Sequence, residues 1–286
     1  MVRKVSELYQ EGRKLLAQGE DQQSANMIAR NLLCHVTGKP WERLLADFDQ
    51  HLTDAESDAL FHAVSKILAG VPLAYVLGEW DFYGMTLSVN PSVLIPRDDT
   101  CAVTELAIEK ARSFKKPPWI LDLCTGSGCI GLAVASRVQE AKVILADISD
   151  DALAVAKDNI TAQNLSERVT CVVSDALGEP AATLGVFDVI VSNPPYITAE
   201  EMTQLPDSVK DHEPHLALFG GDDGLDFYRA IAKNYRKVLK PGGYLCFEFG
   251  MGQGDDVCRI LEENSYTILE RSRDYNDRER AVLAQR

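Results

Sequence analysis

The sequence has no long apolar run. Its first residues, MVRKVSELYQEGRKLL, alternate charged and apolar residues at helical spacing without an uninterrupted apolar stretch. A membrane-spanning helix needs about 20 consecutive apolar residues, and a signal peptide needs an apolar core of about 7–15 residues. We therefore expect neither, and we predict a cytoplasmic protein without a membrane partner.

Basic charge is also scarce. The 286 residues include 29 Lys and Arg against 43 Asp and Glu, which gives a net charge of −14 and a pI near 4.8. Most of the imbalance lies in residues 76–286, which carry 21 basic and 33 acidic side chains. Proteins that bind nucleic acid neutralise its phosphates with clustered Lys and Arg. The composition therefore disfavours direct nucleic-acid binding.

Paired cysteines and clustered metal ligands are missing as well. The seven cysteines form an odd, scattered set without a C-x-x-C pair, so we expect reduced, small apolar residues. His212 and His215 flank a proline with no Cys or third His nearby, and we expect no metal there. The four arginines from Arg271 to Arg280 alternate with acidic residues, which predicts a solvated surface.

The composition is that of a globular protein, 46% apolar and 25% charged, with a length that fits two domains. Residues 1–75 have helical periodicity, and Thr53 and Glu56 have the spacing of a capping box, which predicts a bundle of four or five helices. Residues 76–92 alternate like a β-hairpin, which we interpret as a linker. In residues 93–286, apolar strands alternate with helix-length segments, which predicts an α/β domain with a mostly parallel sheet.

A buried strand, a Gly-rich turn and a helix follow one another in WILDLCTGSGCIGLAVA. Small residues let the backbone approach a ligand, and the helix start offers unpaired N–H groups. Asp147 closes the next strand, 19 residues beyond Gly128, where a carboxylate can accept both ribose hydroxyls, and Asp175 closes the third strand. No GxxxxGK[ST] motif is present, so we expect an adenosine ligand without a phosphate chain.

The next apolar strand, FDVIVS, ends in Asn193-Pro194-Pro195-Tyr196. The two prolines stiffen the backbone and remove its N–H donors. The Asn193 side-chain oxygen and the Pro194 carbonyl oxygen can therefore hold the two hydrogens of a planar NH₂ group, while Tyr196 offers a face for stacking. Acceptors aimed at these hydrogens stabilise the positive charge that the nitrogen gains when it attacks a methyl group.

Several motifs together resemble the release-factor glutamine methyltransferases, the PrmC/HemK family. They are LIPRDDT, DLCTGSG, ADIS, SDA, SNPPYI, EPHLALFGGDDGLDFYR, LKPGGYLCFEFG and RDYNDRERAVLA, and they span most of the chain. The resemblance implies a seven-stranded, Rossmann-like domain that binds S-adenosylmethionine, preceded by a helical bundle that helps to hold the substrate. It also implies that the substrate is the glutamine of the GGQ motif in peptide chain release factors.

The resemblance assigns roles to thirteen residues. Asn193, Pro194, Pro195 and Tyr196 would hold the glutamine amide, with Asn193 also next to the cofactor. The cofactor site would comprise Arg97, Cys124, Thr125, Gly126, Ser127, Gly128, Asp147, Asp175 and Ala176.

Four positions depart from the family pattern. Members commonly have Gly at Cys124, Pro at Asp98, Glu at Cys101 and a large aromatic residue at Ala176. Cys124 is small enough for the loop, whereas Ala176 offers less contact to an adenine, and Asp98 in place of proline loosens the approach to the site.

Other interpretations remain open at the level of sequence. Arg97 either lies near the cofactor or pairs with the Asp98 and Asp99 region, and Glu248 either orients substrate or pairs with a helix N-terminus. An NPPY segment also suits the exocyclic amines of adenine and guanine, so a nucleic-acid amino-methyltransferase is the alternative function. A non-catalytic adaptor is the third, which the intact NPPY segment disfavours.

Overall fold

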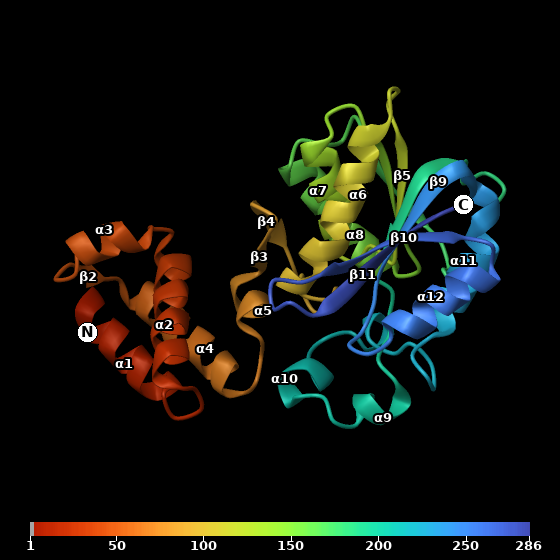
Figure 1. Cartoon of the computed structure of the whole chain (residues 1–286). Coiled ribbons are helices and arrows are strands. Elements are labelled where there is room, and N and C mark those ends of the chain that lie inside the picture. Colours follow the sequence, from red (N-terminus) through yellow and green to blue (C-terminus); the bar gives the residue numbers. More distant parts are fainter. Residues whose placement is uncertain (1–2) are drawn as a thin grey trace. The chain divides into compact units, whose positions relative to one another are not determined.

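A computed structural model describes residues 3–286, and the chain divides into two compact units (Figure 1). The first unit comprises the chain up to Gly78 together with residues 207–212, and the second comprises residues 79–206 and 213–286. These limits differ from the predicted domain boundaries, because the hairpin belongs to the second unit and a later segment joins the first.

The first unit is helical because its apolar residues recur on one face of each helix and its helix starts are capped. Asp21 accepts the N–H groups of Gln23 and Ser24. The capping box is present, since Thr53 Oγ1 accepts the Glu56 N–H at 3.1 Å and the Glu56 carboxylate accepts the Thr53 N–H at 2.8 Å. The elements are β1 (Arg3–Lys4), α1 (Val5–Leu16), α2 (Gln22–Thr37), α3 (Trp41–Ala46), β2 (His51–Leu52), α4 (Asp54–Leu68), α5 (Leu73–Leu77) and α10 (Asp207–Lys210).

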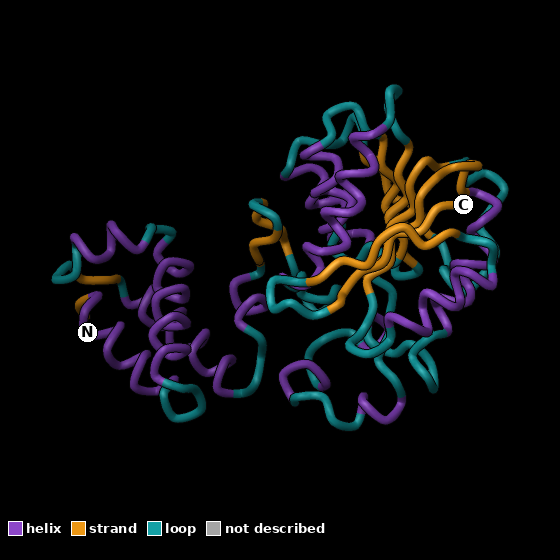
Figure 2. Tube along the Cα trace, viewed as in Figure 1, coloured by secondary structure: helices purple, strands orange, loops and turns teal. Residues whose placement is uncertain are grey.

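The second unit contains the predicted seven-stranded sheet (Figure 2). Its order is β10-β11-β9-β8-β5-β6-β7, and only the pairs that involve β11 are antiparallel. This is the mostly parallel sheet that the alternation of strands and helices predicted, in the Rossmann-like form that the family resemblance implied. The strands are β5 (Trp119–Leu123), β6 (Lys142–Asp147), β7 (Val169–Val173), β8 (Phe187–Ser192), β9 (Leu239–Glu248), β10 (Thr267–Arg273) and β11 (Glu279–Gln285).

Helices cover both faces of this sheet. Successive strand residues point to opposite faces, so Ile120 packs with α6, α7 and α8, whereas Leu121 and Leu123 pack with α11 and α12. The helices and short turns of the unit are η1 (Asp98–Thr100), α6 (Cys101–Ser113), α7 (Cys129–Arg137), α8 (Asp150–Ala162), α9 (Ala199–Met202), η2 (His215–Ala217), α11 (Asp226–Asn234), η3 (Tyr235–Val238) and α12 (Gly254–Glu263).

The predicted hairpin is present as β3 (Glu79–Phe82) and β4 (Met85–Ser88). It is more than a linker, because Phe82 and Leu87 are buried in the core beneath α6, α7 and α8. The Asn159 side chain of α8 also holds the backbone of Ser88, accepting its N–H at 2.6 Å and donating to its carbonyl at 3.0 Å. The hairpin therefore completes one face of the second unit.

Candidate active site

The loops that follow neighbouring strands line one cavity. β5 pairs in parallel with β6 and β8, so these strands end at the same edge of the sheet, where open α/β folds bind their ligands. The predicted residues that line this cavity are Arg97, Cys124, Thr125, Gly126, Ser127, Asp147, Asp175, Ala176, Asn193 and Pro195. Gly128, Pro194 and Tyr196 lie outside this lining.

The loop after β5 has a backbone conformation that favours glycine. Cys124, Gly126 and Gly128 have φ angles of 59°, 54° and 85°. Cys124 is therefore strained, which gives a physical reason for glycine to be common at this position. Gly128 caps α7 and permits close packing, since a Cβ there would lie 3.0 Å from Leu145 Cδ1.

A buried carboxyl group, which the sequence analysis did not single out, supports this loop. Asp122 is 0% exposed, and its Oδ2 accepts the Thr125 hydroxyl at 2.6 Å and the Gly131 N–H at 2.8 Å. Burial raises the pKa of Asp122 to about 7. Asp122 thus ties the loop to the start of α7, and its only signal in the sequence is an acidic residue inside an apolar strand.

The Asp147 carboxylate lines the cavity at the end of β6. One oxygen accepts the Gly126 N–H at 2.9 Å, and the other accepts the Ser149 N–H at 3.0 Å. A carboxylate oxygen has about two acceptor positions, so each oxygen retains one for a ribose hydroxyl. Burial raises the pKa of Asp147. The free acceptor positions of the Asp147 carboxylate fit its predicted role in binding the ribose hydroxyls.

Two apolar side chains flank the predicted adenine position, and sequence reasoning missed both. Ile148 and Leu177 line the cavity and are 47% and 46% exposed. They follow Asp147 and Ala176 directly, so an apolar residue after each strand-end motif was the available signal. Ala176 itself is buried, and Asp175 holds its own turn by accepting the Leu177 N–H at 2.9 Å. Ile148 and Leu177 thus supply apolar surface that Ala176 lacks.

The remaining groups of the cavity suit a polar ligand but no covalent chemistry. Ser127 Oγ is buried without a hydrogen-bond partner in the described chain, which leaves a hydroxyl for a ligand. Burial raises the pKa of the Cys124 and Cys129 thiols far above their usual range, so both remain protonated and are poor nucleophiles. Within residues 3–286, no group of His, Cys, Asp and Glu is arranged to hold a metal ion.

Asn193 and Pro195 bring the NPPY segment to the same cavity as the Gly-rich loop. Asn193 follows β8 directly, and its Nδ2 donates to Thr100 Oγ1 at 3.3 Å. The amide nitrogen of Asn193 therefore points toward Thr100, and its amide oxygen points away from Thr100. Pro194, between Asn193 and Pro195, is buried.

Tyr196 faces a different hollow, which Gly250 and Met251 also line. Its ring packs on Gly250, where a Cβ would lie 2.9 Å from Tyr196 Cδ2. Burial raises the pKa of the Tyr196 phenol far above its usual range, so the ring is neutral. Stacking of Tyr196 on the substrate amide stays a prediction.

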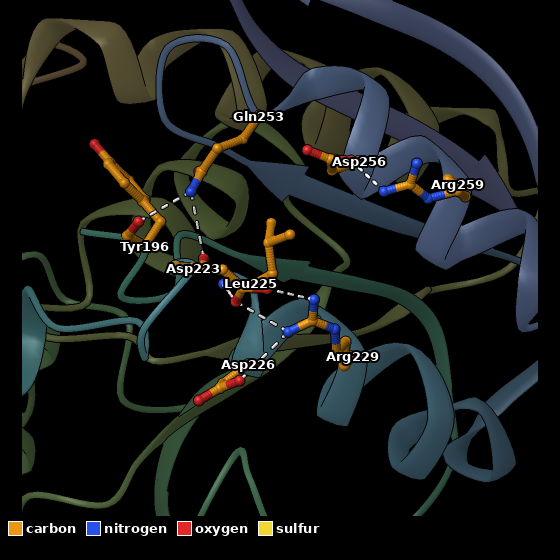
Figure 3. Close-up of polar contacts among 9 residues, drawn as sticks. Tyr196, Asp223, Leu225, Asp226, Arg229, Gln253, Asp256 and Arg259 are labelled. Atoms are coloured by element: carbon orange, nitrogen blue, oxygen red, sulfur yellow. Dashed lines mark hydrogen bonds and ion pairs between the residues drawn. The ribbon is translucent and has the colours of Figure 1, made fainter. Parts of the chain in front are cut away.

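A glycine-rich loop, residues 219–224, supports the NPPY segment from behind. A Cβ on Gly220 would lie 2.6 Å from the Pro195 oxygen, and one on Gly224 would lie 2.3 Å from the Tyr196 oxygen. Figure 3 shows Gln253 joining the two loops, since its Nε2 donates to the Tyr196 oxygen at 3.0 Å and to the Gly224 oxygen at 3.4 Å. The FGGDDG motif thus allows a close approach of two backbones.

Figure 3 also shows how the end of this loop is fastened to α11. Both nitrogens of the Arg229 fork bond the Asp223 carboxylate, at 3.0 and 2.6 Å, and the Leu225 N–H donates to the same carboxylate at 3.1 Å. Arg229 also lies 3.5 Å from Asp226. Residues 223 and 224 of this loop are therefore held by two side chains, Arg229 and Gln253.

Arg97 lines the cavity but pairs with Glu213, not with its neighbours Asp98 and Asp99. The Glu213 carboxylate is buried, and it also accepts the Ile95 N–H at 3.4 Å. This carboxylate fastens the segment before η2 to the segment before η1.

The prediction of a solvated arginine surface is wrong for Arg280, which is 7% exposed. Its Nη2 lies 3.2 Å from Asp274 and 3.1 Å from Asp99. The register between β10 and β11 shifts at this point: Ala281 pairs with Ser272 and Glu279 pairs with Arg273, so Arg280 between them has no partner in β10. Alternating charge in the sequence could not indicate this, because the register of a strand pair decides which face is buried.

Among residues 3–286, no helix combines the length and apolarity that crossing a membrane requires.

Two family models match the sequence: "PrmC N-terminal domain" over residues 7–78 and "Methyltransferase small domain" over residues 103–209.

Two relatives and a solved structure extend these matches. A release factor glutamine methyltransferase of Clostridium acetobutylicum is 38% identical over 257 residues, which is 89% of each chain. Another from Chlorobaculum tepidum is 39% identical over 260 residues, covering 89% of this chain and 88% of the relative. A methyltransferase structure from Pyrococcus furiosus matches the fold with a TM-score of 0.52 at 16% identity, covering 82% of this chain and 98% of that one. The chain belongs to the release factor glutamine methyltransferase family of S-adenosylmethionine-dependent enzymes.

Proposed function

We propose that this protein transfers a methyl group from S-adenosylmethionine to the side-chain amide nitrogen of the GGQ glutamine in peptide chain release factors. One observation carries the proposal. Asn193 and Pro195 line the same cavity as the Gly-rich loop and Asp147, so an amide held at the NPPY segment lies beside a cofactor held at the loop. The names of the relatives in Clostridium acetobutylicum and Chlorobaculum tepidum support this substrate.

The cofactor supplies an electrophilic methyl group on a sulfonium. In our proposal Asp147 accepts the ribose hydroxyls, and Ile148 and Leu177 contact the adenine beside Asp175 and Ala176. Residues 124–128 surround the methionine part, with the unpaired Ser127 hydroxyl available as a polar contact. Arg97 lies at the same cavity, but its guanidinium pairs with Glu213, so we assign it to the cavity wall.

The NPPY segment orients the substrate amide. The Asn193 oxygen and the Pro194 carbonyl accept the two hydrogens of the glutamine NH₂, and the prolines offer no competing N–H. As the nitrogen forms its bond to carbon it gains positive charge, so these acceptors bind the transition state more strongly than the ground state. Fixed orientation adds to the rate, because attack must be in line with the breaking bond. The extra proton leaves to water after the transfer.

The two units divide the work in this proposal. Residues 1–75 form a substrate-recognition domain, residues 76–92 connect it through the hairpin, and residues 93–286 perform the transfer. The substrate is a protein of the translation apparatus, so we place the reaction in the cytoplasm without nucleic-acid or membrane binding.

The test is incubation with labelled methyl donor and one of four acceptors. These are a purified release factor, the same factor with its GGQ glutamine replaced, duplex DNA, and ribosomal RNA. We expect label on the intact release factor alone, at the glutamine identified by mass spectrometry. Label on nucleic acid alone contradicts the proposal and favours an amino-methyltransferase of nucleic acids, and label on none of them favours a non-catalytic adaptor.

A further inference from the structure

Glu248 is a buried carboxyl group next to the amide that holds the substrate. It is the last residue of β9 and is 2% exposed. Ser192 of β8 pairs with Phe247 of β9 in parallel register, so Asn193 and Glu248 are the next residues of adjacent strands. The register therefore brings the two side chains together at the strand ends.

A short polar chain joins Asn193 to this carboxyl group. Asn193 Nδ2 donates to Thr100 Oγ1 at 3.3 Å, and Thr100 and Asn193 are both hydrogen-bond partners of the Glu248 carboxyl group. A hydroxyl that accepts one hydrogen bond still has its own hydrogen to donate, so Thr100 can accept from Asn193 and donate to Glu248. Glu248 Oε2 has no partner in the described chain, which is an unusual state for a buried carboxyl oxygen.

Burial and the groups around Glu248 together determine the pKa of its carboxyl group. Burial raises the pKa of Glu248 to about 7, against the lowering effects of Thr100, Arg280 and Asn193, while Asp99 adds to the rise. Arg280 from β11 is engaged by Asp274 and Asp99, so it does not pair with Glu248 directly. The other titratable groups that sense its charge are all neutral, with raised pKa values: Tyr196, Cys101, Cys129 and Tyr228.

We propose that Glu248 is a positioning residue for methyl transfer, which holds the Asn193 amide nitrogen both directly and through Thr100 and so keeps the Asn193 oxygen aimed at the substrate NH₂. The inference rests on the proposed function. An ionised carboxylate can only accept hydrogen bonds, so the Thr100 hydrogen points to it and the Thr100 oxygen stays available to Asn193. A protonated carboxyl group can donate to the Thr100 oxygen and compete with Asn193. The orientation of Asn193 therefore depends on the ionisation of Glu248.

The test measures kcat, KM and the affinity for S-adenosylmethionine across about pH 5.5–9 for the full-length protein and Glu248→Gln. We expect the wild-type kcat to rise with pH through an inflection near pH 7. Glu248→Gln should lose this inflection and about tenfold in kcat at high pH, since a hydrogen bond to a charged group is replaced by one to a neutral group. KM for the methyl donor and its calorimetric affinity should remain unchanged, which also shows that the variant is folded.

Two controls separate this role from others. Burial also raises the pKa of Asp122 to about 7, so Asp122→Asn is the matched control and should keep the inflection that Glu248→Gln loses. Thr100→Ser keeps the hydroxyl and should retain most of the activity, whereas Thr100→Val has a similar shape without it and should lose about tenfold in kcat.

Each outcome decides a separate point. A wild-type protein that does not methylate release factors contradicts the proposed function and this inference with it. An active wild type combined with an unchanged kcat and inflection in Glu248→Gln, or with Thr100→Val as active as Thr100→Ser, overturns the inference alone.

Discussion

Replacing Gly224 with alanine perturbs the NPPY segment without changing any of its side chains. Gly224 has a φ of 71°, and a Cβ there would lie 2.3 Å from the Tyr196 oxygen and 2.6 Å from Gln253 Nε2. The Tyr196 oxygen belongs to backbone that continues directly from Pro195, so the added methyl group must displace the segment. Gly242 is the matched control, because its φ is 77° and a Cβ there has nothing within 4 Å.

The two substitutions share one destabilising effect and differ in the other. An alanine in the left-handed region costs about 1–2 kcal/mol, which both variants should lose from the free energy of unfolding. Overpacking adds about 1–3 kcal/mol for Gly224→Ala alone. Displacement of a reacting group by about 1 Å reduces a rate by about 100-fold. We therefore expect Gly224→Ala to lose about 100-fold in kcat and Gly242→Ala to keep the wild-type kcat.

Thermal melts and labelled methyl transfer to a release factor measure both effects. We expect Gly242→Ala to melt a few degrees below the wild type and Gly224→Ala to melt further below it. The transfer assay is run below both melting temperatures, and calorimetry with S-adenosylmethionine shows whether the cofactor end is intact. If Gly224→Ala transfers methyl groups as fast as Gly242→Ala, the close backbone approach does not position the substrate, and our account of this loop is wrong.

Two further predictions concern carboxyl groups at the cofactor end. Asp147→Asn should weaken S-adenosylmethionine binding by about tenfold to 100-fold in calorimetry, because charge-assisted hydrogen bonds to the ribose are lost, and the exposed Asp150→Asn should not. Burial raises the pKa of Asp122 from 3.8 to about 7, so its stabilising contribution is present at low pH and falls as the pH rises through 7. Between about pH 5 and pH 8 the folded state should lose about 3 kcal/mol through this group. Asp122→Asn should flatten the pH dependence of the melting temperature. If the melting temperature of Asp122→Asn changes with pH as steeply as that of the wild type, the claim that Asp122 is buried with a raised pKa is wrong.

The parts of the fold that depend on local patterns were predictable from the sequence. The helices of residues 5–77, the hairpin within residues 76–92 and the seven strands follow from periodicity, capping and alternation. The meeting of Asp147 and Asn193 at one cavity was also predictable, because parallel strands end at the same edge of the sheet.

Features that depend on contacts between distant residues were not predictable. Arg97 pairs with Glu213, 116 residues away, instead of with its neighbours in the chain. Arg280 is buried at a register shift between β10 and β11, although its local sequence is that of a surface. Tyr196 follows Pro195 directly, but Pro195 lines the cofactor cavity and Tyr196 lines the hollow beside Gly250 and Met251. The sequence does not show in which direction the backbone turns between these two residues.

The most direct test of the account is the effect of Asn193→Ala on two quantities measured on the same preparation. We predict that labelled methyl transfer to the release factor falls at least about 100-fold, because an acceptor for the substrate NH₂ is lost. We also predict that the calorimetric dissociation constant for S-adenosylmethionine changes by no more than about twofold, since the Gly-rich loop and Asp147 are untouched. Retained transfer, or lost cofactor affinity in a variant that still melts cooperatively, contradicts the claim that Asn193 holds the substrate amide.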